Sequence, residues 1–139
     1  MTDLWPDAEL GEMITDGTVL SFEAASTITK GDLVYLSADM TVSKCTAATQ
    51  HALGVALTTV EAAEVCSVCT NGVVKVTAGG TINRGEQVQT DADAKAITLA
   101  DGSATYDETE LPDRIARAVG VALQTFSSGD TGLIHVSKA

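Results

Sequence analysis

Two stretches of the chain decide the fold: Ser26-Thr-Ile-Thr-Lys-Gly-Asp-Leu-Val34 and Gly80-Thr-Ile-Asn-Arg-Gly-Glu-Gln-Val88. They lie 54 positions apart and share a Thr-Ile pair, a basic residue, a glycine and an acidic residue. Further along, Leu53-Gly-Val-Ala-Leu57 returns as Val119-Gly-Val-Ala-Leu123, at a separation of 66 positions. Because the motifs return in the same order, they indicate an internal duplication of the chain.

The duplication divides the sequence into two related halves, at about 21–77 and 78–139. The larger second separation implies about twelve extra residues in the second half, which we place at about 100–112. Two copies are too few for a solenoid of stacked repeats. We therefore expect a single β domain over residues 21–139, preceded by an N-terminal arm over residues 1–20.

Short β-strands are predicted throughout both halves. The composition is 45% hydrophobic but only 4% aromatic, with many small and β-branched residues that suit strands and tight packing. An apolar run at Asp32-Leu-Val-Tyr-Leu36 follows a turn, and Asn71-Gly72 between two apolar runs predicts a β-hairpin. Eight or more short strands separated by glycine turns predict an all-β fold, a small β-barrel or sandwich built from the two halves.

The charge of the chain excludes several classes of partner. The sequence has 8 Lys and Arg residues against 19 Asp and Glu residues, a formal charge of −11. This charge repels phosphate groups, so we expect no binding to nucleic acid and no docking on an anionic membrane. No run approaches the roughly 18 uninterrupted apolar residues of a membrane span.

The cysteines raise the question of metal or redox chemistry, since Cys66-Ser-Val-Cys69 has the spacing of a ligand pair. Cys45, His51 and His135 do not supply a second pair at the spacing of a zinc site. In a strand, residues i and i+3 face opposite sides and cannot share an ion or form a disulfide without distortion. We expect three structural thiols. A small enzyme using one thiol of the pair as a nucleophile stays an alternative, which ordinary thiol reactivity would exclude.

No catalytic or nucleotide-binding constellation stands out. His135 lies in a predicted strand and His51 in a predicted loop, and no serine occupies a Gly-x-Ser-x-Gly turn. The acidic residues at about 91–110 lack the spacing of an EF-hand, and the glycines form no phosphate-binding loop. We therefore expect no enzymatic activity, no cofactor and no metal ion.

An alternative function rests on the run from Gly72 to Val88, which has the rhythm of biotinyl and lipoyl carrier domains. Those domains also consist of two pseudo-symmetric halves, and their modified lysine sits at an exposed hairpin tip. Lys75 instead lies between Val74 and Val76 in a predicted strand, so we expect a solvent-facing strand lysine. A barrel-sandwich type carrier or binding module remains the alternative.

The N-terminal arm differs in character from the rest of the chain. Leu4, Trp5 and Leu10 are apolar, but Pro6, Gly11 and several acidic residues interrupt any continuous strand. Trp5 is the only tryptophan, and tryptophan is a common anchor of protein interfaces. It either folds back on its own domain or anchors a neighbouring subunit or partner.

Seven short segments carry a family resemblance through their order and spacing: residues 14–20, 28–34, 52–57, 64–68, 72–76, 82–88 and 119–123. Together they resemble the small phage capsid cement, or head decoration, proteins, many of which carry an old label as RecA/RadA-like recombinases. The resemblance spans about residues 13–138. The recombinase label finds no support, since no nucleotide-binding loop is present. The arm at Leu4-Trp5-Pro6 and the insertion are longer than in the plainer members.

The resemblance implies a non-enzymatic virion protein. Such proteins bind the outer surface of the expanded head, often as homotrimers at three-fold or quasi-three-fold positions, and clamp neighbouring major capsid protein subunits. A charge of −11 suits the outer surface better than the DNA-filled interior. From their positions in the arm and the insertion, we predict capsid or inter-subunit contacts at Leu4, Trp5, Pro6, Leu10, Tyr106 and Leu111.

Overall fold

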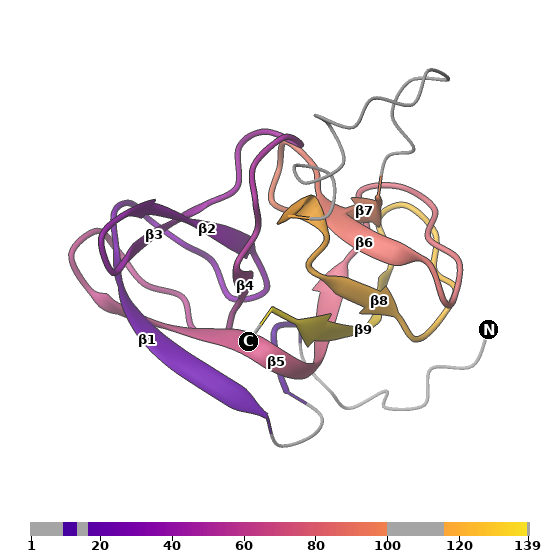
Figure 1. Ribbon diagram of the computed structural model, residues 1–139, viewed down its shortest axis with the longest axis horizontal. Coiled ribbons are helices and arrows are strands. Elements are labelled where there is room, and N and C mark those ends of the chain that lie inside the picture. Colours follow the sequence, from indigo (N-terminus) through magenta and orange to yellow (C-terminus); the bar gives the residue numbers. More distant parts are fainter. Residues whose placement is uncertain (1–9, 14–16, 100–115, 139) are drawn as a thin grey trace.

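The computed structural model describes residues 10–13, 17–99 and 116–138 of the 139-residue chain. These residues are almost entirely strands and turns, which confirms the all-β prediction (Figure 1). No helix among them is long and apolar enough to cross a membrane. The strands are β1 Thr18–Ala24, β2 Leu33–Ala38, β3 Thr41–Lys44, β4 Gly54–Ala56, β5 Val65–Thr77, β6 Gln87–Thr90, β7 Ala96–Thr98, β8 Gly120–Ala122 and β9 Thr131–Ser137.

The first half of the chain closes a barrel, which we call the first barrel. Its strand order is β1-β3-β2-β4-β5, and β5 pairs with β1 to close the ring. The predicted turn before β2 is present: Gly31 has φ +95°, and the Asp32 carboxylate accepts a hydrogen bond from the Thr29 N–H at 3.0 Å. Glycine is required there because other residues rarely adopt this conformation.

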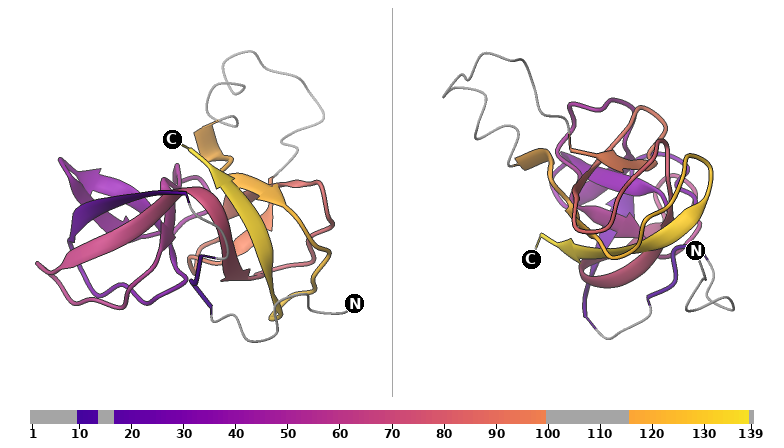
Figure 2. Two further views of the ribbon diagram at one scale, coloured as in Figure 1. Left: turned by 90° about the horizontal axis from the view of Figure 1, so that it is seen from below. Right: turned by 90° about the vertical axis from the view of Figure 1, so that its right-hand side faces the viewer.

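The second half repeats this arrangement and forms the second barrel. β5 pairs with β9, β9 with β8, β8 with β6, and β6 with β7. A parallel bridge between Ala78, directly after β5, and Ala96 of β7 closes the ring of strands. The parallel pairing of β1 with β3 has the equivalent place in the first barrel. The 13-residue β5 therefore forms a wall of both barrels, and Figures 1 and 2 show it running from one to the other.

The predicted hairpin at Asn71-Gly72 is wrong. β5 continues through both residues, and Asn71 pairs with Thr18 of β1 and with Ser137 of β9. Gly72 has φ +147°, and a Cβ on it would lie 2.9 Å from the Met13 Cε atom. The dipeptide thus marks the point at which β5 passes from one barrel to the other. Long-range pairing of both flanks overrides the local turn signal.

The hydrogen bonds at the turns repeat with the sequence. An antiparallel bridge between Ile28 and Val60 has its counterpart between Ile82 and Phe126, at the same separations of 54 and 66 positions. Backbone N–H groups also donate to equivalent side chains in both halves: Thr29 to Asp32 and Asn83 to Glu86, and Lys30 to Thr59 and Arg84 to Thr125. The duplication is therefore structural as well as sequential.

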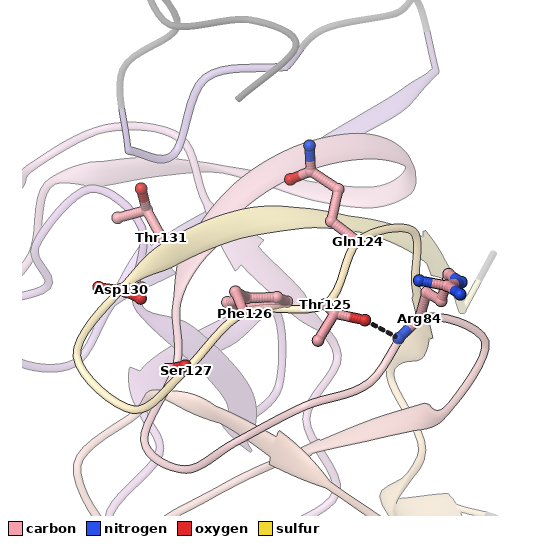
Figure 3. A pocket seen from close by; sticks show the side chains of 7 residues that line it. All are labelled: Arg84, Gln124, Thr125, Phe126, Ser127, Asp130 and Thr131. Atoms are coloured by element: carbon pink, nitrogen blue, oxygen red, sulfur yellow. Dashed lines mark hydrogen bonds between the residues drawn. The ribbon is translucent and has the colours of Figure 1, made fainter. Parts of the chain in front are cut away.

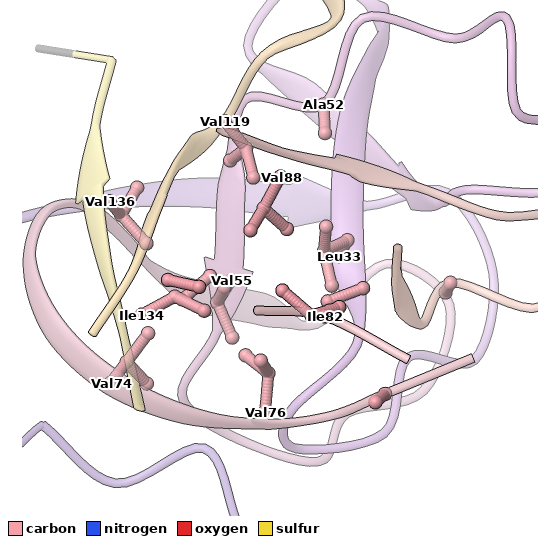
Figure 4. Packing of buried hydrophobic residues seen from close by; sticks show 14 of the residues in the cluster. Leu33, Ala52, Val55, Val74, Val76, Ile82, Val88, Val119, Ile134 and Val136 are labelled. Carbon is pink, nitrogen blue, oxygen red and sulfur yellow. The ribbon is translucent and has the colours of Figure 1, made fainter. Parts of the chain in front are cut away.

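Each barrel has an apolar interior, and the larger of the two clusters also joins the barrels. The first barrel is filled by Phe22, Ala24, Ile28, Val34, Val42, Ala56, Val60, Cys66 and Val68. The cluster of the second barrel extends to five residues of the first: Leu33, Cys45, Ala52, Val55 and Cys69. Figure 4 shows Leu33 and Val55 among the second-barrel side chains. A fully buried Leu or Val side chain contributes about 1.5–3 kcal/mol to the free energy of folding. The apolar contact therefore holds the two barrels together.

Candidate functional site

Of the six residues predicted to make capsid or inter-subunit contacts, the described part of the chain contains Leu10. The other five lie outside it: Leu4, Trp5, Pro6, Tyr106 and Leu111. Leu10 is half-buried, and a Cβ built on Gly31 would lie 2.5 Å from the Leu10 Cγ atom. Leu10 therefore packs against a turn of its own chain.

The segment from Gly11 to Met13 runs along β5 and pairs with it through an isolated β-bridge. The Gly11 N–H donates to the Lys75 carbonyl oxygen at 2.7 Å, and the Lys75 N–H donates to the Glu12 carbonyl oxygen at 3.3 Å. Met13 forms an antiparallel bridge with Val74. The segment thereby covers the outer edge of β5 in the second barrel.

Lys75 is buried, with 6% of its surface exposed, so the prediction of a solvent-facing lysine is wrong. That prediction considered only the neighbours of Lys75 within its strand. In the fold, β5 also pairs with β9 on one side and with residues 11–13 on the other. A lysine in the middle of a three-stranded region does not fit a carrier domain, whose lysine protrudes from a hairpin tip.

β1 carries the equivalent edge of the first barrel. At the repeat separation of 54 positions, Val19 and Ser21 of β1 correspond to Val73 and Lys75 of β5. On this side β1 pairs with β3 only from Glu23 onward, and no described strand lies beside the preceding residues. Within the described residues, the outward backbone groups of Val19 and Ser21 have no backbone partner. We call this stretch the open edge of β1.

The surroundings of the open edge indicate what could bind there. Val19 and Leu20 are 44% and 43% exposed. Glu23 is exposed at the end of the edge. An extended segment of a partner would gain backbone hydrogen bonds and apolar contacts here. A basic residue at one end of that segment would face Glu23.

The cysteines do not form a chemical site. All three are buried and free, and Cys66 and Cys69 belong to different hydrophobic clusters on opposite faces of β5, as predicted. Burial raises the pKa of Cys45 to about 11 and raises the pKa of Cys66 and Cys69 as well. A thiol nucleophile needs a lowered pKa. Among the described residues, no group of three or more His, Cys, Asp or Glu side chains is placed to hold a metal ion.

A hollow of about 590 Å³ lies at the rim of the second barrel (Figure 3). Its lining consists of Arg84, Gln124, Thr125, Phe126, Ser127, Asp130 and Thr131. The Arg84 N–H donates to Thr125 Oγ1 at 3.1 Å, and the Arg84 and Asp130 side chains stand at opposite ends of the view. The described residues that line the hollow include neither a histidine nor a cysteine.

The fold is similar to that of a phage head protein. The crystal structure of the head fiber gp8.5 N base in bacteriophage phi29 matches with a TM-score of 0.60 and 19% sequence identity. The match covers 88% of this chain and 95% of that one. At this identity the likeness shows the fold alone. No curated protein matches the sequence.

The family comparison covers both barrels. The sequence profile described as "Phage cement protein" matches residues 14–137. This range begins before β1 and ends with the last residue of β9. It agrees with the resemblance carried by the order and spacing of the seven segments of the sequence. The chain therefore belongs to the phage cement protein family.

Proposed function

We propose that this chain is a non-enzymatic virion protein that binds the outer surface of the expanded head and stabilises contacts between major capsid protein subunits. Its membership of the phage cement protein family carries the proposal. The charge of −11 supports an outer position, because packaged DNA repels a strongly negative protein. The raised pKa values of the three thiols support a structural rather than a catalytic role.

The stabilisation follows from linkage. A protein that binds the assembled shell but not its dissociated subunits lowers the free energy of the assembled shell and leaves that of the subunits unchanged. Each bound copy therefore raises the temperature and the internal pressure that the shell withstands. We infer that the bound form is a homotrimer, since three copies around a three-fold axis meet three equivalent shell surfaces.

The open edge of β1 is the surface that we assign to the capsid contact. In the second barrel, the equivalent edge is covered by residues 11–13 through the two backbone hydrogen bonds at Lys75. This pairing supports the view that an extended segment fits such an edge. In the first barrel, we propose that an extended segment of the major capsid protein takes this place, with its backbone paired to Val19 and Ser21.

The proposal is tested by co-sedimentation of the purified protein with expanded capsids of the parent phage that lack it. We expect binding to saturate at a number of copies that icosahedral symmetry allows, and to raise the temperature at which the capsids fall apart. Capsids treated in the same way with a protein of similar charge serve as the control. Absence of binding to intact shells would contradict the function.

Substitution of Ser21 with proline tests the capsid contact. The Ser21 N–H points away from β5, and proline is tolerated at an edge position whose N–H faces outward. We expect Ser21→Pro to fold normally but to bind capsids at least about tenfold more weakly, a loss of about 1.4 kcal/mol. Ser21→Ala keeps the N–H and should bind like the parent. Equal binding of the two variants in the same co-sedimentation titration would refute the assignment of this edge.

A further inference from the structure

The packing of the first barrel on the second is the starting point for an inference about neighbouring copies. On the first barrel the contact is made by a set that we call the docking face: Leu33, Cys45, Ala52, Val55 and Cys69. The Leu33 N–H donates to the Ala94 carbonyl oxygen at 3.0 Å, and the Cys45 thiol is hydrogen-bonded to Thr90. Gln89 adds a bond from its Nε2 to the Ala48 carbonyl oxygen at 3.2 Å.

The second barrel receives the docking face through a set that we call the acceptor face. It consists of Val74, Thr90, Ala94, Val119 and Val136, each of which is almost completely buried. Four of the five share one hydrophobic cluster with the docking face. Figure 4 shows Val74, Val119 and Val136 around the same core as Leu33 and Val55.

The internal repeat places the same acceptor face on the first barrel. At the separations of 54 and 66 positions, its counterparts are Leu20, Leu36, Met40, Leu53 and Thr70. Leu20, Leu36 and Met40 are 43%, 51% and 64% exposed, and they are three of the six exposed large apolar side chains in the described chain. Leu53 is half-buried, and Thr70 is fully buried as its counterpart is. Three positions that are buried in the second barrel are thus open to solvent in the first, and we call these three together with Leu53 the open acceptor face.

The open acceptor face is also hollowed. One hollow of about 560 Å³ includes Phe22, Leu36 and Met40 in its lining, and another of about 450 Å³ includes Leu36 and Leu53. Leu36 therefore stands between two depressions. Side chains from an opposing surface would fill them, as those of the docking face fill the space beside Thr90 and Ala94.

The second barrel carries a counterpart of the docking face as well. At the repeat separations it consists of Gln87, Leu99, Ala118, Val121 and His135. These residues are neighbours: Gln87 pairs with Val121, Val121 pairs with His135, and the Leu99 N–H donates to the Gln87 carbonyl oxygen. All except the exposed Gln87 are half-buried. We call this set the second docking face.

We propose that the second docking face of one copy binds the open acceptor face of another copy, and so repeats between molecules the contact that joins the two barrels within one. The two faces differ, so the contact runs head to tail. A head-to-tail contact closes into a ring where the rotation between copies allows it, and three copies in a ring agree with the proposed homotrimer. The inference concerns copies of this chain alone and does not require capsid binding.

Charge sets the conditions under which this contact is seen. Each copy carries a formal charge of −11, so two copies repel each other at long range. The attraction comes from apolar side chains, which salt does not weaken. We therefore expect association to strengthen as salt rises from about 0.05 to about 0.5 M, because the Debye length shortens.

Pairs of engineered cysteines test the geometry of the contact. The intramolecular contact of Leu33 with Ala94 predicts that Gln87 of one copy meets Met40 of the next. The contact of Cys45 with Thr90 likewise predicts that Leu99 of one copy meets Leu36 of the next. Oxidation of Met40→Cys/Gln87→Cys, or of Leu36→Cys/Leu99→Cys, with oxidised glutathione should give disulfide-linked oligomers. The native cysteines are fully buried and should not interfere.

Control variants separate this contact from random collision. Val65 is 67% exposed but belongs to neither face, so Leu36→Cys/Val65→Cys should stay monomeric on a non-reducing gel. Equal cross-linking of that control would overturn the proposal, and so would cross-linking by Met40→Cys alone.

Sedimentation velocity gives an independent measurement that needs no capsid. We expect Leu36→Glu/Met40→Glu to weaken association at least about tenfold, with the circular dichroism spectrum unchanged because both side chains are exposed. Val65→Glu/Thr131→Glu adds the same charge at two exposed positions outside both faces and should associate like the parent. A parent protein that stays monomeric at high salt would overturn the inference. Capsid co-sedimentation of the same samples would show whether the proposed function stands without it.

Discussion

Replacement of Gly120 with alanine is expected to lower the free energy of unfolding by at least about 3 kcal/mol, at the upper end of what overpacking costs. A Cβ on Gly120 would lie 2.0 Å from the His135 carbonyl oxygen and 2.8 Å from its carbonyl carbon. These are backbone atoms of β9, which pairs with β8 at this point. A rotamer change cannot relieve the contact, so the two strands must separate.

The first barrel contains the same constraint at the equivalent position. A Cβ on Gly54 would lie 2.1 Å from the Cys69 carbonyl oxygen, and we expect Gly54→Ala to be similarly destabilising. Gly80→Ala is the matched control, because its Cβ would meet only Ile97 Cγ2, at an ordinary 3.7 Å. Urea unfolding followed by circular dichroism measures all three variants. A Gly120→Ala protein as stable as the Gly80→Ala control would show that β8 and β9 do not pair as described.

A second large effect is expected at a buried pair of residues. In one barrel the pair consists of a large and a very small residue, and in the other barrel of two residues of intermediate size. In the second barrel the Phe126 ring covers Gly132, and a Cβ there would lie 2.5 Å from ring carbons. The counterparts in the first barrel, at 66 positions earlier, are Val60 and Cys66. Phe126→Val should cost about 2–4 kcal/mol by leaving a cavity. Gly132→Cys should cost about 1–3 kcal/mol or more by overpacking.

The double variant Phe126→Val/Gly132→Cys recreates the pair of the first barrel. We expect it to be more stable than either single variant, with a coupling energy of at least about 2 kcal/mol. Leu36→Ala combined with Gly132→Cys provides the control, and its two effects should add because Leu36 is 51% exposed and lies in the other barrel. Thermal and urea unfolding of the full set give the cycle. Additive costs for Phe126 and Gly132 would show that the two halves do not share one packing scheme.

The architecture was predictable because it depends on local signals that occur twice. The turn at Gly31 and Asp32 and its counterpart at Gly85 and Glu86 have the same backbone conformation and the same capping hydrogen bonds. One signal occurs once, the dipeptide Asn71-Gly72, and its hairpin prediction failed. The dipeptide lies where the halves meet, and there the pairing partners of β5 decide the conformation. Those partners are far away in the sequence.

The candidate surfaces were less accessible to sequence reasoning. The predicted contact residues were chosen from the arm and the insertion, and most of them lie outside the described residues. The open edge of β1 exists because β3 pairs with β1 only from Glu23 onward. No sequence pattern indicates where that pairing begins. The open acceptor face is different. Leu36 and Met40 could have been singled out by aligning the halves, since their counterparts are the smaller Thr90 and Ala94.

The strand shared by the two barrels has a mechanical consequence. β5 is hydrogen-bonded to β1 and β4 over its first part and to β9 over its second. If one barrel is held by the shell and the other is pulled, the load passes along this strand and through the packed contact between the barrels. The hydrogen bonds of β5 are then loaded in shear along the strand rather than opened one by one. Neither barrel can melt without taking a wall from the other, so the protein yields as one unit.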